Sequence, residues 1–318
     1  MPRSETTPVA AICREEALAK INLSLHVTRR RPDGYHELDS LVVFAGPGDR
    51  VEVTPAVTDP AKWNTVFEEG PAKRDLHVSG PFSDALAQES DNLVQRAEHQ
   101  FREAFGSPPA RLHLQKNLPV AAGIGGGSAD AAATLRALSR LWKLSPEPKK
   151  MAALALKLGA DVPVCLSQRP VHMSGIGEKL APLAQMPALH LLLVNPGIAL
   201  STPAVFRSLK NTEIRKDTGR SHPGRFSSMD ELTGWLRSAG NDLEAPASAL
   251  VPEIGEILHL LRRQQGCLLA RMSGSGATCF GLFARAADTH RAEAVMKTAF
   301  AGGWVQPVEA AARVSAPG

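Results

Sequence analysis

Hydrophobic and polar residues alternate along residues 17–27, which is the pattern of a β-strand with one face toward a core. Ile21 and Leu23 fall on the apolar face of this segment, whereas Lys20 and Asn22 fall on its polar face. The pattern therefore places a lysine and an asparagine on the same side of one strand. By default, a lysine in such a position is a solvated surface residue.

Similar patterns predict the other secondary-structure elements. Alternation or a short apolar run indicates a strand, and apolar residues that recur every three or four positions between capping and terminating residues indicate a helix. The predicted strands span residues 38–45, 50–54, 75–79, 111–116, 190–194, 267–272, 277–283 and 304–308. The predicted helices span residues 92–105, with Ser90 or Asp91 as the cap, 128–138, 145–159, 201–209, 229–238, 251–264 and 286–299.

The order of these elements indicates a mixed α/β protein with two domains. Strands and helices alternate through the first half of the 318 residues, and a second domain is expected to begin near residues 166–175. We place the domains at 1–168 and 169–318. Residues 211–228 are polar and rich in charge, glycine and serine, which predicts a loop.

Composition argues against several classes of protein. The chain is 43% hydrophobic and 21% charged, as in ordinary globular proteins, and no apolar run is long enough to cross a bilayer. The first 19 residues include Glu5, Glu15 and Glu16 and lack a continuous apolar core, so they resemble neither a signal peptide nor a transit peptide. We therefore expect a cytoplasmic protein with no membrane partner.

Charged residues and potential metal ligands narrow the range of possible substrates, partners and cofactors. The net charge of +4 suits an anionic small-molecule substrate, although solvated surface lysines and arginines explain it equally well. The single tyrosine and the absence of a concentrated basic arm argue against nucleic-acid binding. The cysteines lack CxxC spacing and the histidines lack HExxH spacing, so we expect free thiols and no protein-ligated metal.

The segment Leu118–Ala133 (LPVAAGIGGGSADAAA), called the glycine segment below, has the features of a phosphate-binding loop. Its glycines let the backbone come close to a ligand, and an alanine-rich helix follows them. Backbone amides at the start of a helix lack intrahelical partners and attract anions. A flexible linker is the alternative, but linkers rarely lie between a predicted strand and a capped helix.

Two common nucleotide-binding motifs do not fit the glycine segment. A Walker A loop requires GKS or GKT, and this segment contains no lysine. The dinucleotide fingerprint requires a third glycine where the chain has Ser128.

Two further glycine-containing segments, Ser174–Glu178 (SGIGE) and Met272–Ala277 (MSGSGA), are each ordinary turn signals when taken alone.

In combination, three segments resemble the GHMP kinases, the superfamily of galacto-, homoserine, mevalonate and phosphomevalonate kinases. These segments are Ala19–Leu23, the glycine segment and Met272–Ala277. The resemblance implies an α+β, two-domain GHMP kinase fold that binds ATP and substrate in a cleft between the domains. It implies an N-terminal domain of the ribosomal protein S5 domain 2-like type and a C-terminal GHMP kinase α/β-sandwich domain.

One family of this superfamily is matched more closely. From about residue 17 to residue 284 the chain resembles the 4-diphosphocytidyl-2-C-methyl-D-erythritol kinases in five segments, namely Ala19–Leu25, Arg31–Leu38, Leu158–Val164, Asn195–Gly197 and Thr202–Phe206. It departs from that family at Ala129, where a polar residue is common. Another GHMP kinase, acting on homoserine or mevalonate, and a catalytically silent nucleotide-binding member of the fold are the alternatives.

This family resemblance implies a phosphotransferase that uses ATP. The γ-phosphoryl group would pass to the 2-hydroxyl of 4-diphosphocytidyl-2-C-methyl-D-erythritol, a step of non-mevalonate isoprenoid biosynthesis. We expect Mg²⁺ to accompany ATP, held mainly by phosphates and water. We also expect a monomer or a weak homodimer.

Asp161 and Lys20 are the candidate catalytic residues. The implied acceptor is a tertiary alcohol, for which a carboxylate near its proton is the expected base. Asp161 precedes the apolar stretch Val162–Val164, which would not ordinarily hold a free carboxylate, although an aspartate there could instead cap a helix. Lys20 would keep Asp161 ionised and would stabilise the charge that develops during transfer.

The resemblance also implies the binding residues. Tyr35 and Phe206 would lie on opposite faces of the cytosine ring, with His36 at the base edge, although Phe206 could instead serve helix packing. Asn22 would orient the methylerythritol hydroxyls, and the other substrate-binding candidates are Thr202, Gly274 and Ser275. The candidate ATP-binding residues all lie in the glycine segment: Pro119, Val120, Ala121, Ala122, Gly123, Ile124, Gly125, Gly126, Gly127, Ser128 and Ala129.

Overall fold

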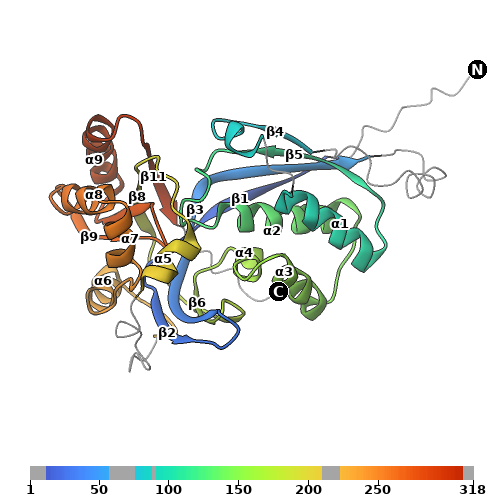
Figure 1. The fold of residues 1–318 in the computed structure, drawn as a ribbon, viewed down its shortest axis with the longest axis horizontal. Helices are drawn as coiled ribbons and strands as arrows, with labels where there is room; N and C mark the ends of the chain where they lie inside the picture. Colours follow the sequence, from blue (N-terminus) through green and yellow to red (C-terminus); the bar gives the residue numbers. More distant parts are fainter. Residues whose placement is uncertain (1–11, 57–75, 88–90, 210–222, 311–318) are drawn as a thin grey trace, which may run out of the picture.

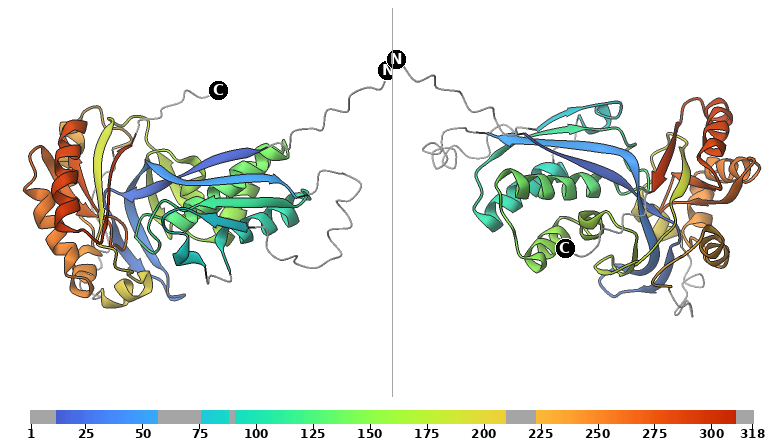
Figure 2. Two further views of the ribbon diagram at one scale, coloured as in Figure 1. Left: turned by 90° about the horizontal axis from the view of Figure 1, so that it is seen from above. Right: turned by 180° about the vertical axis from the view of Figure 1, so that it is seen from behind.

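The structure is a computed structural model that describes residues 12–56, 76–87, 91–209 and 223–310 (Figure 1). The described residues form two halves, and one long curved strand, β3 (His36–Pro55), runs from the first half into the second (Figures 1 and 2). Residues 211–222 of the predicted loop lie outside the described ranges.

The first half is a sheet with helices on one face. Four strands pair antiparallel with β3: β1 (Cys13–Asn22), β2 (His26–Arg30), β5 (Ala110–Gln115) and β6 (Val171–Gly175). Two further strands extend the sheet: β4 (Leu76–Ser79), parallel to β5, and β7 (Lys179–Pro182), antiparallel to β6. The helices on one side of the sheet are α1 (Leu93–Phe105), α2 (Gly126–Leu141), α3 (Pro148–Leu158) and α4 (Val162–Ser167) (Figure 1). A short 3₁₀ helix spans Asp84–Leu86.

Helix α2 lies at the centre of the first half because its sequence suits close packing. Its buried face is rich in alanine, including Ala131, Ala132 and Ala133, which are fully buried. Small side chains let the helix approach β1 and β3 closely, while Leu135 and Leu138 fill the remaining core. This packing fixes the start of α2, and therefore the glycine segment, against the sheet.

The second half is an antiparallel sheet covered by helices on its outer side. Its strands are β8 (Leu189–Asn195), β9 (Cys267–Met272), β10 (Cys279–Phe283) and β11 (Trp304–Ala310). Its helices are α5 (Thr202–Ser208), α6 (Met229–Ser238), α7 (Glu244–Leu250), α8 (Glu253–Arg262) and α9 (Ala286–Ala299). A bridge between Glu309 and Gly46 joins β11 to β3, so the strand order β4-β5-β3-β11-β8-β10-β9 is continuous across both halves.

Several elements agree with the sequence predictions residue for residue, namely α6, α9 and β9. Four elements were not predicted: α4, α7, β6 and β7. The predicted boundary after residue 168 falls between α4 and β6, and β6 pairs with β3 of the first half. The division into 1–168 and 169–318 stays a prediction.

The strand predicted over residues 17–27 is interrupted, which corrects the sequence analysis. β1 ends at Asn22 and β2 begins at His26, and the face expected to be polar and solvated is buried. The cause is tertiary, because the amide of Leu25 donates a hydrogen bond of 2.9 Å to the carbonyl of Gly240 in the second half. The second half therefore covers the face that the alternation assigned to solvent.

The strands predicted at 38–45 and 50–54 are one continuous strand, β3. The register between β1 and β3 shifts between Ala17 and Ala19, so that pairing continues past the glycines in the middle of β3. A Cβ atom at Gly48 would lie 2.2 Å from the carbonyl oxygen of Ala17. Only a residue without a side chain permits this approach.

Two helix starts also differ from the predictions. Asn92, rather than Asp91, caps α1, because its side chain accepts a hydrogen bond of 2.9 Å from the amide of Val94. Ser90, the other predicted cap, lies outside the described residues. Helix α3 begins at Pro148, which occupies the first turn in place of the proline two positions earlier.

The four cysteines are free, as predicted. Cys165 and Cys279 are buried, and burial raises the pKa of the Cys165 thiol to about 12.

Within the ranges that the structure describes, no helix has both the length and the apolar character needed to span a membrane.

Candidate functional site

The glycine segment forms the turn that leads into α2, and residues distant in the sequence hold its backbone. The carbonyl of Ile124 accepts a hydrogen bond of 2.9 Å from the amide of Lys20 on β1. The carbonyl of Ala122 accepts one of 3.1 Å from the amide of Thr278, just before β10. Gly125, the residue before the helix, has a φ of +64°, which favours glycine. Both halves of the molecule thus fix the turn.

Helix α2 begins at Gly126, two residues earlier than the predicted start at Ser128. Its first intrahelical bond runs from the amide of Ala129 to the carbonyl of Gly125, at 2.8 Å. The amides of Gly126, Gly127 and Ser128 precede that bond and have no intrahelical acceptor. Together with the helix dipole, they make this end of α2 favourable for a phosphate group.

Lys20 and Asp161 form an ion pair beside this helix start. The Nζ atom of Lys20 lies 2.7 Å from Oδ2 of Asp161, and the lysine side chain is 6% exposed. Gly125 packs on the lysine stem, since a Cβ atom there would lie 3.1 Å from the Cβ of Lys20. Lys20 therefore lies beside Asp161 as expected, and the default alternative of a solvated lysine is wrong, because the glycine segment covers the side chain.

Asp161 occupies the position before α4, but its carboxylate does not cap that helix. The side chain makes no capping hydrogen bond and is 38% exposed. The helix-capping alternative from the sequence analysis is therefore wrong. Its carboxylate accepts from Lys20 and remains open on one side.

Asp161 opens into a cavity of about 600 Å³, which we call the acceptor cavity. Elements of both halves line it, including the start of α2, the β2–β3 connection and helix α5. Its lining includes Ser128, Asp161 and an aromatic group. The lining residues are Arg30, Gly34, Tyr35, His36, Leu38, Ser128, Ala160, Asp161, Ile176, Thr202, Pro203, Phe206, Arg207 and Leu209.

The aromatic residues that line the acceptor cavity are Tyr35, His36 and Phe206. The rings of His36 and Phe206 are stacked, with centroids 4.7 Å apart and planes 25° from parallel. At this separation no base fits between these two rings, so the faces that remain for a base are the outer ones. Tyr35 is 56% exposed. Burial and, second, the charge of Arg30 lower the pKa of His36, so its imidazole is neutral at pH 7.

Gly274 and Ser275, predicted to bind substrate, are outside the lining of the acceptor cavity and contact residues of the site. A Cβ atom at Gly274 would lie 2.6 Å from the carbonyl oxygen of Gly123, so this glycine permits contact with the glycine segment. The hydroxyl of Ser275 lies 2.8 Å from that of Thr202, which lines the acceptor cavity. The link from these two residues to the cavity therefore passes through the glycine segment and Thr202.

Asn22 lies under the site and is 1% exposed. Its side-chain amide donates a hydrogen bond of 2.7 Å to the hydroxyl of Ser40, and its amide N–H donates to that of Ser273 at 3.1 Å. Its Oδ1 atom is buried and has no hydrogen-bond partner. The structure thus brings Asn22 to the site but shields it from the acceptor cavity.

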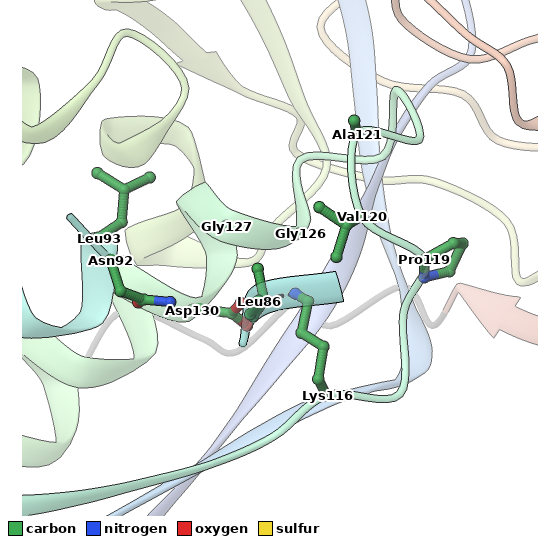
Figure 3. A pocket seen from close by; sticks show the side chains of 10 residues that line it. All are labelled: Leu86, Asn92, Leu93, Lys116, Pro119, Val120, Ala121, Gly126, Gly127 and Asp130. Carbon is green, nitrogen blue, oxygen red and sulfur yellow. Dashed lines mark hydrogen bonds and ion pairs between the residues drawn. The ribbon is translucent and has the colours of Figure 1, made fainter. Parts of the chain in front are cut away.

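A second, smaller cavity of about 180 Å³ also lies at the start of α2 (Figure 3). Five candidate ATP-binding residues line it: Pro119, Val120, Ala121, Gly126 and Gly127. The other lining residues were not predicted: Leu86, Asn92, Leu93, Lys116 and Asp130. We call this space the nucleotide cavity. Of the remaining candidates, Ser128 lines the acceptor cavity, whereas Ala122, Ile124 and Ala129 contribute backbone or packing, since they are at most 4% exposed.

Lys116 is the most informative residue that the sequence analysis missed. It follows β5 directly, and its Nζ atom donates hydrogen bonds to Asp49 (2.5 Å) and Asp130 (2.7 Å). Burial lowers the pKa of Lys116, but the two carboxylates raise it more, so the ammonium stays charged. A lysine at the end of an alternating strand was the available signal, but a lysine was sought only within the glycine segment.

Among the described residues, no three His, Cys, Asp or Glu side chains gather in an arrangement that could hold a metal ion.

Comparison with known proteins assigns both halves to one superfamily. The family description "GHMP kinases N terminal domain" matches residues 92–169, and "GHMP kinases C terminal" matches residues 215–302. The crystal structure of a homoserine kinase from Cytophaga hutchinsonii has a TM-score of 0.65 at 16% identity over 97% of each chain, which reflects the shared fold. The predicted α+β, two-domain GHMP kinase fold is confirmed.

Relatives with much higher sequence identity to this chain are named as one kinase. A 4-diphosphocytidyl-2-C-methyl-D-erythritol kinase of Parvibaculum lavamentivorans is 50% identical over 293 residues, which cover 92% of this chain and 96% of the relative. One from Cereibacter sphaeroides is 50% identical over 299 residues, covering 93% and 98%. A crystal structure of 4-(cytidine 5'-diphospho)-2C-methyl-D-erythritol kinase has a TM-score of 0.72 at 32% identity, covering 94% of this chain and 99% of that one. With such identity over nearly the full length of both proteins, this chain belongs to the 4-diphosphocytidyl-2-C-methyl-D-erythritol kinase family of GHMP kinases.

Proposed function

We propose that this protein transfers the γ-phosphoryl group of ATP to the 2-hydroxyl of 4-diphosphocytidyl-2-C-methyl-D-erythritol, in non-mevalonate isoprenoid biosynthesis. One observation carries the proposal. A carboxylate, Asp161, is held at 2.7 Å by a buried lysine and opens into a cavity shared with Ser128 at the α2 start. This arrangement offers a base for an alcohol next to a place for its phosphoryl donor.

The chemistry needs positioning and charge stabilisation more than covalent help. The acceptor oxygen attacks the γ-phosphorus, the bond to the β-phosphate oxygen breaks, and ADP leaves with that electron pair. Asp161 takes the hydroxyl proton. Lys20 holds the carboxylate in place through their ion pair and offsets negative charge as it develops.

The nucleotide binds as MgATP, with its phosphates at the amide-rich start of α2. Mg²⁺ bound to the phosphates would neutralise part of their charge, while the free amides at the start of α2 would hold them and the nucleotide cavity would hold the rest of ATP. Elements of both halves flank the transfer point. The protein acts in the cytoplasm as a monomer or weak homodimer.

The cytidine end of the substrate lies at Tyr35, His36 and Phe206. The stacked pair of His36 and Phe206 presents an outer aromatic face for the base, and Tyr35 approaches from the exposed side. Between the base and Asp161 the substrate carries a diphosphate. Arg30 and Arg207 line the same cavity and supply positive charge there.

The variant Asp161→Asn tests the proposal. Since a general base contributes about 10²–10⁴-fold, kcat should fall by that factor while the Kd for MgATP stays within about twofold. ADP formation that requires the diphosphocytidyl acceptor is the assay, and isothermal titration gives the Kd. Asp230→Asn, at an exposed aspartate of α6, is the matched control and should behave as wild type.

Other outcomes separate the alternatives. Near-normal kcat in Asp161→Asn would reject the base. Turnover of homoserine or mevalonate, with none of the diphosphocytidyl acceptor, would indicate another GHMP kinase. Binding of ATP without turnover of any of these acceptors by wild-type protein would indicate a catalytically silent member.

A further inference from the structure

A buried cluster of three charged side chains lies beneath the start of α2, and the mechanism above uses none of them. Lys116 donates to Oδ2 of both Asp49 and Asp130, and the three side chains are 3%, 0% and 3% exposed. Figure 3 shows Lys116 and Asp130 at the nucleotide cavity. A Cβ atom at Gly126 would lie 3.1 Å from the lysine Nζ, so the cluster sits directly under the first amides of the helix.

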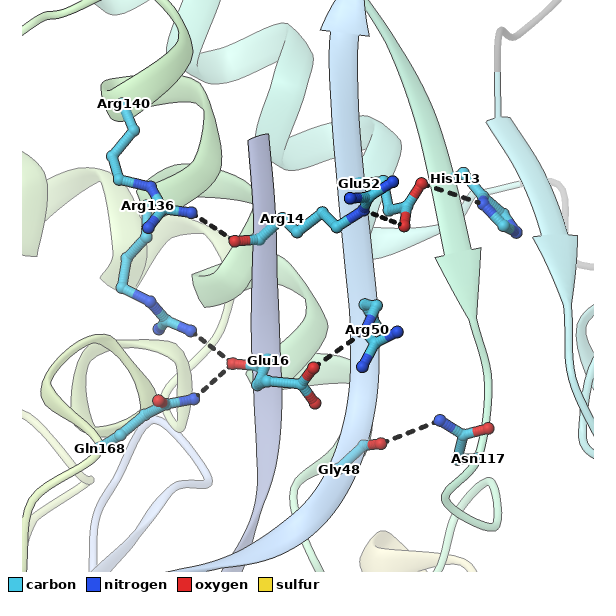
Figure 4. Close-up of polar contacts among 10 residues, drawn as sticks. All are labelled: Arg14, Glu16, Gly48, Arg50, Glu52, His113, Asn117, Arg136, Arg140 and Gln168. Carbon is cyan, nitrogen blue, oxygen red and sulfur yellow. Dashed lines mark hydrogen bonds and ion pairs between the residues drawn. The ribbon is translucent and has the colours of Figure 1, made fainter. Parts of the chain in front are cut away.

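The cluster joins the two ends of the glycine segment. Oδ1 of Asp49 accepts hydrogen bonds from the amides of Asn117 (2.6 Å) and Leu118 (2.8 Å), where the segment begins. The side chain of Asn117 also donates to the carbonyl of Gly48, at 3.0 Å (Figure 4). Asp130 belongs to α2, where the segment ends. Both oxygens of Asp49 therefore accept hydrogen bonds, Oδ1 from the backbone at the start of the segment and Oδ2 from Lys116.

Asp130 differs from Asp49 because one of its oxygens is free. Its Oδ1 atom is buried and has no hydrogen-bond partner, while the residue is 2% exposed and lines the nucleotide cavity. Buried polar atoms are nearly always paired. Because Asp130 lines the nucleotide cavity, a ligand bound there is the partner that we infer for this atom.

The charges decide whether this atom accepts or donates. One ammonium and two carboxylates carry a formal charge of −1 beneath the place where a polyphosphate must bind. A single proton on the cluster removes that charge. Since Oδ2 of Asp130 accepts from Lys116, the proton belongs on Oδ1, which then becomes a hydrogen-bond donor.

The surroundings favour that proton. Burial raises the pKa of Asp130 to about 8; the charge of Lys116 opposes the shift and that of Asp49 adds to it. The titratable groups that face Asp130 are Asp49 of β3, Lys116 after β5 and Cys165 of α4. The Cys165 thiol has its pKa raised to about 12 by burial and stays neutral.

We propose that Asp130 is a nucleotide-binding residue that acts as a neutral carboxylic acid, its Oδ1–H donating a hydrogen bond to the nucleotide in the nucleotide cavity. This inference rests on the proposed ATP site. It makes nucleotide affinity depend on a proton held by the protein. Loss of that proton removes the donor and restores a net negative charge under the phosphates.

The test measures MgADP binding to the full-length protein by isothermal titration between pH 7 and 9.5. In wild type the Kd should rise above about pH 8 by up to tenfold per pH unit, because binding then requires uptake of one proton. Asp130→Asn carries a neutral donor at every pH, so its Kd should be flat. Titration in two buffers of different ionisation enthalpy gives the proton uptake directly, and this uptake should be lower in the variant. Proton exchange by MgADP itself is common to both proteins and cancels.

Controls keep the result interpretable. Asp230→Asn, on the surface of α6, should retain the wild-type pH dependence. If Asp130→Asn does not fold, ¹³C NMR of wild type labelled at aspartate carboxyls should show one that titrates near pH 8 and stays protonated to higher pH with MgADP bound. A wild-type Kd that is flat to pH 9.5, or an equal slope in Asp130→Asn, overturns the inference. ADP formation with the diphosphocytidyl acceptor at pH 7 tests the proposed function separately.

Discussion

At the residue scale, the positive charges of the acceptor cavity are of two kinds. Lys20 is paired with Asp161 at 2.7 Å and serves the reacting end. Arg30 and Arg207 line the cavity, and neither has an ion-pair partner among the described residues. Arg31 is instead paired with Asp33 at 2.7 Å. Unpaired guanidinium groups suit the diphosphate, whereas the paired lysine suits the base.

Replacing an unpaired arginine should therefore affect binding and spare the chemical step. Arg207→Gln or Arg30→Gln should raise the KM for the diphosphocytidyl acceptor about tenfold, the value of one charge-assisted hydrogen bond, with little change in kcat. The effect should shrink in high salt, because both side chains are exposed. Steady-state kinetics at two salt concentrations measure it. Arg29→Gln, exposed and outside the cavity lining, should match wild type, and a loss of kcat with unchanged KM in either cavity variant would contradict this role.

At the scale of elements, the glycine segment and Met272–Ala277 form one structural unit. A Cβ atom at Gly123 would lie 2.6 Å from the backbone nitrogen and oxygen of Gly276. The hydroxyl of Ser273 donates a hydrogen bond of 3.1 Å to the carbonyl of Gly123. The predicted phosphate-binding loop and a weaker turn signal therefore form one structural unit, because each glycine leaves space for the other backbone.

Gly123→Ala should disrupt this unit. The clash and the positive φ of +73° should lower the free energy of unfolding by about 2 kcal/mol or more and should reduce kcat as well. Gly255→Ala is the control, since nothing lies within 4 Å of a Cβ placed at that position in α8. It should raise the unfolding free energy by up to about 1 kcal/mol. Urea unfolding measures both, and equal stability of the two variants would show that the close approach is not required.

At the scale of the whole molecule, polar side chains bind the two halves together. The guanidinium of Arg271 is buried and donates to the carbonyls of Leu23 (2.7 Å), Leu236 (2.9 Å) and Ala239 (2.9 Å). Leu23 follows β1, which carries Lys20, whereas the other two carbonyls belong to the second half. The position of β1, and with it that of Lys20, therefore depends on contacts between the halves.

Arg271→Met should weaken the whole fold. It leaves three buried carbonyls without these donors, so the free energy of unfolding should fall by about 2–4 kcal/mol. Thermal unfolding followed by circular dichroism should show a lower Tm. Arg263→Met, at an exposed arginine after α8, should change stability by no more than about 0.5 kcal/mol. A wild-type Tm in Arg271→Met would show that packing alone holds the halves together.

The sequence by itself determined the features that depend on near neighbours. The glycine segment and its helix, the helices over 229–238 and 286–299, and the family all follow from local patterns and ordered motifs. Lys20 and Asp161 were found as candidates because motifs mark them. The contact between them, across 141 positions, was expected only through the resemblance.

Only the tertiary structure decided which polar groups are buried and paired. Lys116 donates a hydrogen bond to Asp49, which lies 67 positions away in the sequence, and no local sequence pattern predicts such a partner. Burial on both sides of the segment from Lys20 to His26 likewise depends on the second half, so alternation wrongly assigned one face to solvent. Hydrophobic periodicity reports the preference of a segment for a core. The burial that raises the pKa of Asp130 and the ion pair between Lys20 and Asp161 both depend on chain segments that only folding brings together.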